Sequence, residues 1–266
     1  KHRADPRAKN KEALLWAGYK KHSETVKLLV KFDADILAED DNALRWGACY
    51  GLTETVKVAL NGEYDVHEDD DYAVRAAGGN GETETLKLIL DRGGDIHANN
   101  DYALRSAAKN GHTETVRLLL ERGANIHAAN DESLQTAAKR GQTDMVELLL
   151  DHGADIHAMS GHALLTASEN GQTETVTLLL NRGADTHSSG INGLKNPNFC
   201  LERAAMCQHS ETVKILLKHY TEEELKALTG DEDFKNAEKE IADRLKTLRL
   251  IRSAKKAREQ NQGMVI

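Results

Sequence analysis

Histidine recurs at a constant spacing along the chain, and imidazole is the side chain most often used as a metal ligand or as an acid–base group near neutral pH. Neighbouring members of the series are 30 residues apart: His67, His97, His127, His157 and His187. Equivalent residues of stacked repeats lie roughly 8–10 Å apart, whereas zinc ligands lie about 2.0–2.1 Å from the metal. Equivalent rings are therefore too far apart to share an ion. The spacing predicts structural histidines, each ring bonding the backbone of its own segment, and no metal or cofactor.

No other group of residues in the sequence suggests catalysis. A glycine-rich phosphate loop and a nucleophile elbow are both missing from the sequence. The three cysteines, Cys49, Cys200 and Cys207, lack metal-ligand spacing and have no non-repeated histidine and acid around them. An active site is a single asymmetric arrangement, whereas most polar positions here recur. We therefore expect that the chain is not an enzyme.

The composition indicates a folded, soluble protein with a thin core. Of the 266 residues 39% are hydrophobic and only 4% aromatic, which suits Leu, Ala and Val packed between short repeated helices. The net charge of −8 disfavours general nucleic-acid binding. Apolar runs are far shorter than the ~20 residues that span a bilayer, and no secretory signal pattern is present. Together with an odd number of cysteines, these features predict a cytoplasmic protein without membrane contact.

One sequence unit repeats along the chain. A pair of apolar or small residues opens each unit, and six of the pairs follow one another at steps of 30 residues. A seventh pair comes 37 residues after the sixth, so seven residues are inserted before it. The pairs are Ala13-Leu14, Ala43-Leu44, Ala73-Val74, Ala103-Leu104, Ser133-Leu134, Ala163-Leu164 and Cys200-Leu201. The units begin near residues 11, 41, 71, 101, 131, 161 and 198.

The unit of residues 101–130 predicts two short helices. Asp101 is the expected N-cap of the first helix, whose buried face carries Leu104, Ala107 and Ala108 at i, i+3 and i+4. Asn110-Gly111 is expected to stop it. Thr113 is the expected N-cap of a second helix with Val116, Leu119 and Leu120 on its buried face and Gly123 at its end. Residues 125–128 are expected to be extended and to lead into the next unit.

Neither helix is long enough to be stable alone, so each unit must bury its apolar face against its neighbours. The runs GHTETVRLLLERGANIHA (residues 111–128) and GQTDMVELLLDHGADIHA (residues 141–158) resemble the second helix and exit segment of ankyrin repeats. The likeness recurs in all seven units and covers about residues 1–220. It implies an all-α ankyrin-repeat solenoid that binds other proteins on its concave face.

The sequence departs from the usual ankyrin pattern at the start of each unit. Tyr102-Ala103-Leu104-Arg105 stands where the family has Thr-Pro-Leu-His. The segment that joins the second helix of one unit to the first helix of the next, which we term the finger, is three residues shorter than in the usual repeat of ~33 residues. Such short-fingered arrays resemble those encoded by viruses and by some intracellular bacteria. That resemblance implies a host protein as the partner, sequestered or inhibited in the host cytosol.

Both ends of the array differ from its middle. The chain opens with residues that match the end of a unit and lacks an initiator Met, which predicts that the native protein begins earlier. Residues 221–266 are expected to cap the array, with a short helix over 221–228 whose capping box is Thr221 and Glu224, and a long helix from Asp231. Its last part is basic, which indicates either a solvated helix end or a tail for nucleic acid or an acidic partner: Arg249, Arg252, Lys255, Lys256 and Arg258.

The positions that differ between units mark the expected binding surface. Trp16 and Trp46 occupy one register in adjacent units, where later units carry small or polar residues. They are either interface anchors or fillers between successive first helices. Tyr19, Tyr50, Tyr72 and Tyr102 are expected at or near the same face. Asp40 and Asp70 belong to strongly acidic fingers, whereas Lys109, Lys139 and Arg140 make the middle of the groove basic.

These observations predict a scaffold for protein–protein interaction, and the acidic, aromatic half favours a basic partner. The inserted residues within 188–198 lengthen the last finger and predict either a further contact or a clasp over the C-terminal helix. Three alternatives stay open: binding of nucleic acid or an acidic partner through the basic tail, an adaptor for catalysis located elsewhere, and a self-assembling array.

Overall fold

A computed structural model describes residues 43–61, 64–187 and 198–229, together with scattered residues between 13 and 29 and between 237 and 246. Every regular element in these ranges is a helix, so the predicted all-α class is confirmed. The chain forms two compact units. The N-terminal unit comprises residues 1–133 and 151–154, and the C-terminal unit comprises residues 134–150 and 155–266.

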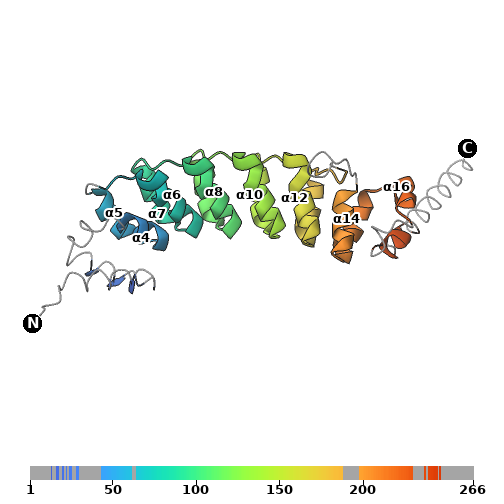
Figure 1. The fold of residues 1–266 in the computed structure, drawn as a ribbon, viewed down its shortest axis with the longest axis horizontal. Coiled ribbons are helices and arrows are strands. Elements are labelled where there is room, and N and C mark those ends of the chain that lie inside the picture. The colour runs from blue at the N-terminus through green and yellow to red at the C-terminus, as the bar shows by residue number, and fades with distance from the viewer. Residues whose placement is uncertain are drawn as a thin grey trace, which may run out of the picture. The chain divides into compact units, whose positions relative to one another are not determined.

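The helices follow one another in antiparallel pairs within each unit (Figure 1). The N-terminal unit contains α4 (Ala43–Tyr50), α5 (Thr53–Asn61), α6 (Glu68–Asn80), α7 (Thr83–Asp91), α8 (Ala98–Asn110) and α9 (Thr113–Glu121). The helix α10 (Ala128–Lys139) runs from this unit into the C-terminal one. There follow α11 (Thr143–Asp151), α12 (Ala158–Glu169), α13 (Thr173–Asn181), α14 (Phe199–Met206), α15 (Ser210–Leu216), the 3-10 helix η2 (Leu217–His219) and α16 (Glu222–Ala227).

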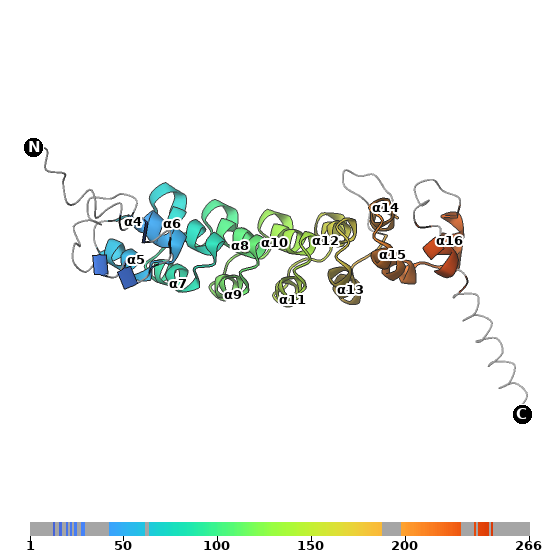
Figure 2. The ribbon, with the colours of Figure 1, turned by 90° about the horizontal axis from the view of Figure 1, so that it is seen from below.

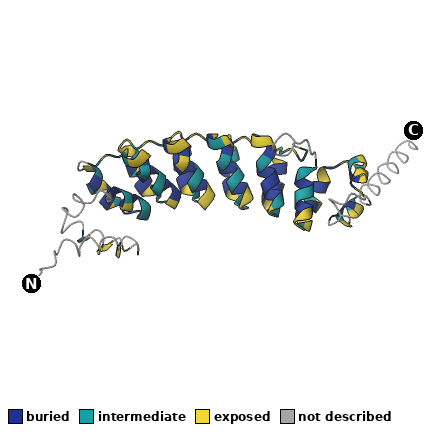
Figure 3. Ribbon diagram, in the orientation of Figure 1, coloured by how far each residue is buried: buried dark blue, intermediate teal, exposed yellow. Residues whose placement is uncertain are grey.

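First helices pack on first helices and second helices on second helices, which gives two rows within each unit (Figure 2). In the N-terminal unit, α4, α6 and α8 form one row and α5, α7 and α9 the other. The buried residues lie between the helices, while the turns that join one pair to the next are largely exposed (Figure 3). This arrangement lets short helices share one continuous core.

The predicted core positions of the unit of residues 101–130 are confirmed, with one exception. Leu104, Ala107 and Ala108 of α8 and Val116 and Leu119 of α9 are fully buried, and each fully buried leucine contributes roughly 1.5–3 kcal/mol. Leu120 is only half-buried. Small residues let the first helices approach closely: a Cβ at Gly78 of α6 would lie 2.7 Å from the Cβ of Ala103. Helices this close leave no room for many aromatic rings.

The helix ends agree with the sequence in part. Gly111 stops α8 in the left-handed conformation, at φ 79°, with its N–H and that of His112 donating to the last carbonyl groups of the helix. That prediction is confirmed. The prediction for Thr113 is wrong, because Thr113 is the first residue of α9 and the N-cap is His112, whose side chain makes no capping bond. The first threonine of one second helix instead bonds the second threonine of the next, as Thr83 Oγ1 and Thr115 Oγ1 do at 2.7 Å.

The fingers differ most from expectation. In the finger before α8, which is equivalent to the predicted extended segment 125–128, His97 has helical dihedral angles. The three residues from Asn99 to Asp101 are all left-handed, with φ between 52° and 55°. The segment 125–128 ends likewise in a turn at residues 126–127 and enters α10 at Ala128, so the predicted extended conformation is wrong. Left-handed geometry costs about 1–2 kcal/mol per residue in L-amino acids, and Asn and Asp tolerate it best.

Asp101 fastens one finger to the next instead of capping its own helix, so its predicted role as an N-cap is wrong. Its Oδ1 accepts the backbone N–H of Asn125 at 2.7 Å and bonds the Nδ1 atom of His97 at 3.0 Å. Its own N–H closes the left-handed turn onto the carbonyl of His97 at 3.1 Å. Asp71 repeats the arrangement one unit earlier, accepting the N–H of Asp95 at 2.7 Å. These bonds offset the strain of the turn.

The C-terminal cap begins as predicted. Thr221 accepts the N–H of Glu224, and the carboxylate of Glu224 accepts the backbone N–H of Thr221 at 2.6 Å, so the capping box is confirmed. The backbone bond from Thr221 lowers the pKa of Glu224. Arg244 donates from Nε to the carbonyl of Leu217, the first residue of η2, at 3.2 Å. The long finger, at residues 188–197, lies outside the described residues, as does most of the predicted long helix.

We expect Asp101→Asn to lower the free energy of unfolding by about 1–3 kcal/mol, because a buried carboxylate loses its charge while its two donors stay in place. Asparagine still tolerates the left-handed conformation, so the backbone preference is kept. Glu121→Gln, at an exposed position of α9, removes the same charge and should change stability by less than about 0.5 kcal/mol. Urea denaturation followed by circular dichroism measures both. Equal stability of the two variants contradicts the fastening role of Asp101.

Candidate functional site

Exposed aromatic side chains gather in the N-terminal unit. Trp16 is 63% exposed and Trp46 of α4 is 38% exposed. The ring of Trp46 stacks on that of Tyr50, one helical turn further on, with centroids 5.6 Å apart and planes at 10°. Tyr50 in turn packs against the apolar cluster of Ala17 and Leu52. Trp46 is therefore held in one orientation by a ring that is itself anchored in the core.

A second aromatic feature is a row of alternating arginine and tyrosine side chains, Arg45, Tyr72, Arg75, Tyr102 and Arg105, which we term the arginine–tyrosine row. Arg45 lies 5.0 Å from the ring centroid of Tyr72, and Arg75 lies 5.7 Å from Tyr72 and 6.0 Å from Tyr102. Arg105 lies 5.6 Å from Tyr102. In such cation–π contacts the guanidinium group is attracted to the face of the aromatic ring.

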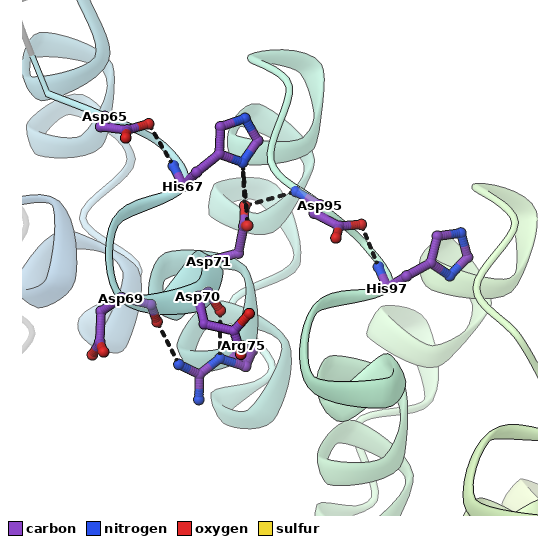
Figure 4. Close-up of polar contacts among 8 residues, drawn as sticks. All are labelled: Asp65, His67, Asp69, Asp70, Asp71, Arg75, Asp95 and His97. Carbon is purple, nitrogen blue, oxygen red and sulfur yellow. Dashed lines mark hydrogen bonds and ion pairs between the residues drawn. The ribbon is translucent and has the colours of Figure 1, made fainter.

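The arginines of the row also hold the fingers. Arg75 donates from Nε to the carbonyl of Asp70 at 2.8 Å and from Nη2 to that of Asp69 at 2.6 Å (Figure 4). Arg105 makes the same two bonds, to the carbonyls of Asn100 and Asn99 at 2.9 and 3.0 Å. The left-handed turns point these carbonyl groups back at the helix that follows, where a guanidinium fork matches them.

Sequence reasoning missed the three arginines, although a signal was present. Arg45, Arg75 and Arg105 follow the opening pair of their units at the same 30-residue spacing as the histidines. What they bond could not be inferred, because the acceptors are finger carbonyls whose direction depends on the left-handed turn. Tyr72 is half-buried and its hydroxyl lies 3.5 Å from Sγ of Cys49, so this predicted surface residue is only partly accessible.

Charge on the acidic fingers is partly neutralised. Arg45 pairs with Asp69 at 3.1 Å and with Glu68 at 3.7 Å. Asp71 is buried and engaged by His67, while Asp70 is exposed. Of the predicted basic positions, Lys109 is exposed at the end of α8 in the N-terminal unit, and Lys139 and Arg140 are exposed at the end of α10 in the C-terminal unit. The predicted charge gradient along the whole groove stays a prediction.

Several predicted site residues lie outside the described part of the chain. They are Tyr19, Asp40, and the five basic residues of the tail, Arg249, Arg252, Lys255, Lys256 and Arg258. Their predicted roles therefore stay predictions.

The histidine rings bond aspartate side chains, so the prediction that each ring bonds the backbone of its own finger is wrong. His67, His97 and His127 each place Nδ1 3.0–3.1 Å from a carboxylate oxygen of the aspartate four residues later. The series then changes: Gly161 replaces the aspartate in the unit of His157. His187 instead contacts Glu224 of the cap, at 3.3 Å from Nε2.

Metal binding and the reactivity of the Cys200 thiol can both be judged from the described residues. Within residues 43–61, 64–187 and 198–229, no three potential metal-ligating side chains form a group that could hold an ion. Burial raises the pKa of the Cys200 thiol to about 12, which keeps it protonated. The exposed side chains of the N-terminal unit include the rings of Trp16, Trp46 and Tyr102, and aromatic side chains are enriched in binding surfaces.

Comparison with known families agrees with the helix pairs and their finger turns. Residues 72–160 match the family model of ankyrin repeats, in three copies. Residues 72–160 of the chain are therefore ankyrin repeats. No curated protein matches its sequence. Among the helices that the structure describes, none has both the length and the apolar character needed to cross a membrane.

We expect the pKa of His67 to lie above the ordinary value of about 6.5, because its ring bonds the Asp71 carboxylate and is attracted by that charge. Its contribution to the stability of this ankyrin repeat is therefore fully present below pH 6.5 and is lost as the pH rises through the higher folded-state pKa. NMR titration of the ring Cε1–H signal measures this value.

Two variants give the control for the His67 titration. Asp71→Asn should return the pKa of His67 towards 6.5, whereas Asp65→Asn should lower it less, because Asp65 acts only through a weaker charge interaction. Both spectra must keep the dispersion of the folded protein. A His67 pKa that is unchanged in Asp71→Asn contradicts the assignment of the shift to Asp71.

Proposed function

We propose that this ankyrin repeat protein is a non-catalytic scaffold that binds a partner protein through the surface of Trp16, Trp46, Tyr50 and the arginine–tyrosine row. Ankyrin repeats generally mediate protein–protein interaction, and the family is typically non-catalytic. The observation that carries the proposal is the exposure of Trp16 and Trp46, at 63% and 38%. Large aromatic side chains are the commonest energetic anchors of protein interfaces.

The stacking of Trp46 on Tyr50 supports this function. A tryptophan that only filled space between helices would be buried, and each square ångström of exposed apolar surface forgoes about 25 cal/mol. Trp46 keeps its ring partly in solvent and in one orientation, against a tyrosine that is fixed in the core. A side chain already held in its binding orientation loses little conformational entropy on association. The later units carry Ser106 and Thr136 at this register and keep the helix pairs.

The charge of the fingers favours a basic partner. Glu68, Asp69 and Asp70 lie at one finger, and Arg45 offsets part of their charge through its contacts with Glu68 and Asp69. Asp70 stays exposed. Charges at the edge of an interface mainly raise the association rate and are screened by salt. We therefore expect the association rate to fall with ionic strength more steeply than the dissociation rate rises.

The setting that we propose is the cytoplasm, with a host protein as the partner. The three cysteines, Cys49, Cys200 and Cys207, are free thiols, which suits a reducing compartment. The host partner follows from the resemblance of the short-fingered repeats to viral and intracellular-bacterial arrays. The exposed aromatic surface would then serve to sequester or inhibit that protein.

The experiment compares partner capture by three forms of the chain from host-cell lysate: the native sequence, the pair Trp16→Ala/Trp46→Ala, and the pair Lys57→Ala/Lys87→Ala. The two lysines are exposed on second helices α5 and α7. We expect the tryptophan pair to capture a partner at least about tenfold less well, since anchors of this kind contribute more than 1–2 kcal/mol each.

The lysine pair is the matched control and should capture as the native chain does. Equal urea midpoints establish that all three forms are folded. If the lysine pair loses the partner and the tryptophan pair keeps it, the second helices form the binding surface and the proposal is wrong.

A further inference from the structure

Arg75 and Arg105 occupy the same position in successive repeats, but among the described residues Arg105 pairs with a carboxylate and Arg75 does not. Both use Nε and Nη2 for the two finger carbonyls. Arg105 then donates from its third nitrogen, Nη1, to the carboxylate of Glu132. Tyr102 stands at the register of Glu132 one repeat earlier, 30 residues before it. Tyr102 offers Arg75 a ring face at 6.0 Å and no carboxylate.

The Nη1 atom of Arg75 is therefore a donor without a carboxylate partner among the described residues. Its guanidinium group projects from the finger with two nitrogens bonded to carbonyls and one pointing away from them (Figure 4). The group is fixed, because two backbone bonds and the rings of Tyr72 and Tyr102 hold it. It is also reachable, since Arg75 is half-buried and Tyr102 is 40% exposed.

Among the described residues, the carboxylates of the three neighbouring aspartates form no ion pair with Arg75. Asp69 directs its carboxylate to Arg45 and only its carbonyl to Arg75. Asp70 likewise gives its carbonyl to Arg75. The carboxylate of Asp71 is buried between His67 and the N–H of Asp95. A pre-positioned guanidinium with a free edge binds carboxylates more strongly than neutral acceptors.

The same surroundings restrict what can bind there. Asp70 is exposed and Glu68 partly so, and both repel an acidic run of residues. A single carboxylate flanked by basic residues suits this surface. The carboxylate bonds Arg75, while the neighbouring cations face the acidic finger. A partner segment of this kind is basic overall, which is the net charge that the acidic fingers favour.

We propose that Arg75 is a carboxylate-binding position of the partner surface: it takes one Asp or Glu side chain of a basic partner segment, in the place that Glu132 occupies beside Arg105. This inference rests on the proposed function, because it assigns part of the same surface. It adds a specific recognition element, one acidic side chain read by one arginine between two tyrosine rings.

The test follows the Nε–Hε and Nη signals of Arg75 by NMR, assigned with Arg75→Lys, on the full chain. Two probes are titrated: acetyl-Lys-Glu-Lys-amide and acetyl-Lys-Gln-Lys-amide. We expect a saturable shift with the glutamate peptide and a response at least about threefold weaker with the glutamine peptide, since the charge-assisted bond is the stronger one.

Two variants at position 102 control the test from within the chain. Tyr102→Glu supplies a carboxylate at the register of Glu132 and should abolish the response to the glutamate peptide. Tyr102→Gln removes the same ring without adding a charge and should retain part of that response, because the two finger carbonyls still hold Arg75. Their urea midpoints establish that both are folded, and we expect Tyr102→Glu to be the more stable of the two at low salt, with the difference lost at high salt.

Three results overturn the proposal: equal responses to the two peptides, a full response in Tyr102→Glu, or an equal shift with inorganic phosphate at the same ionic strength. The last result identifies a general anion site. None of these readouts uses the partner or the tryptophans. A failed capture experiment with a positive peptide titration therefore refutes the proposed function alone, and the reverse combination refutes only the role of Arg75.

Discussion

A buried carboxylate at the base of two successive fingers, Asp71 in one and Asp101 in the next, holds repeats of the N-terminal unit together. Asp71 and Asp101 each accept a backbone N–H from the following finger, at 2.7 Å in both cases. The bond spans 24 residues of sequence and fixes the finger of one repeat to that of the next. It helps to offset the strain of three consecutive left-handed residues. The finger turn, the arginine that bonds it and the surface above it all depend on this contact.

The arginine–tyrosine row connects the fold to the proposed function. The left-handed turn directs two carbonyl groups towards the helix. These acceptors must be hydrogen-bonded by the protein or by water. Arg75 and Arg105 satisfy two each, and in doing so they are placed against the tyrosine rings. A side chain that stabilises the scaffold is thereby held rigidly at the surface. This is the arrangement that reduces the entropy lost when a partner binds.

The same architecture explains why function is placed on a surface and why the aromatics are few. Helices that pack as closely as α6 and α8, with Gly78 against Ala103, leave space mainly for small and aliphatic residues in the core. Trp16 and Trp46 account for both tryptophans of the sequence and both are exposed.

The sequence by itself determined the helix pairs, their buried faces, the stop at Gly111 and the capping box of Thr221, because each depends on residues within one or two helical turns. It also placed Trp16 and Trp46 in one register. Only the tertiary structure decided the left-handed fingers, the partners of the histidine rings and the arginine–tyrosine row. Asp101 looked like an N-cap because local spacing suits that role, yet its acceptor atom serves Asn125 in the next repeat. The contacts between repeats described above join residues about 24 to 32 positions apart. No local pattern shows which of the competing hydrogen bonds is made once the fingers are stacked.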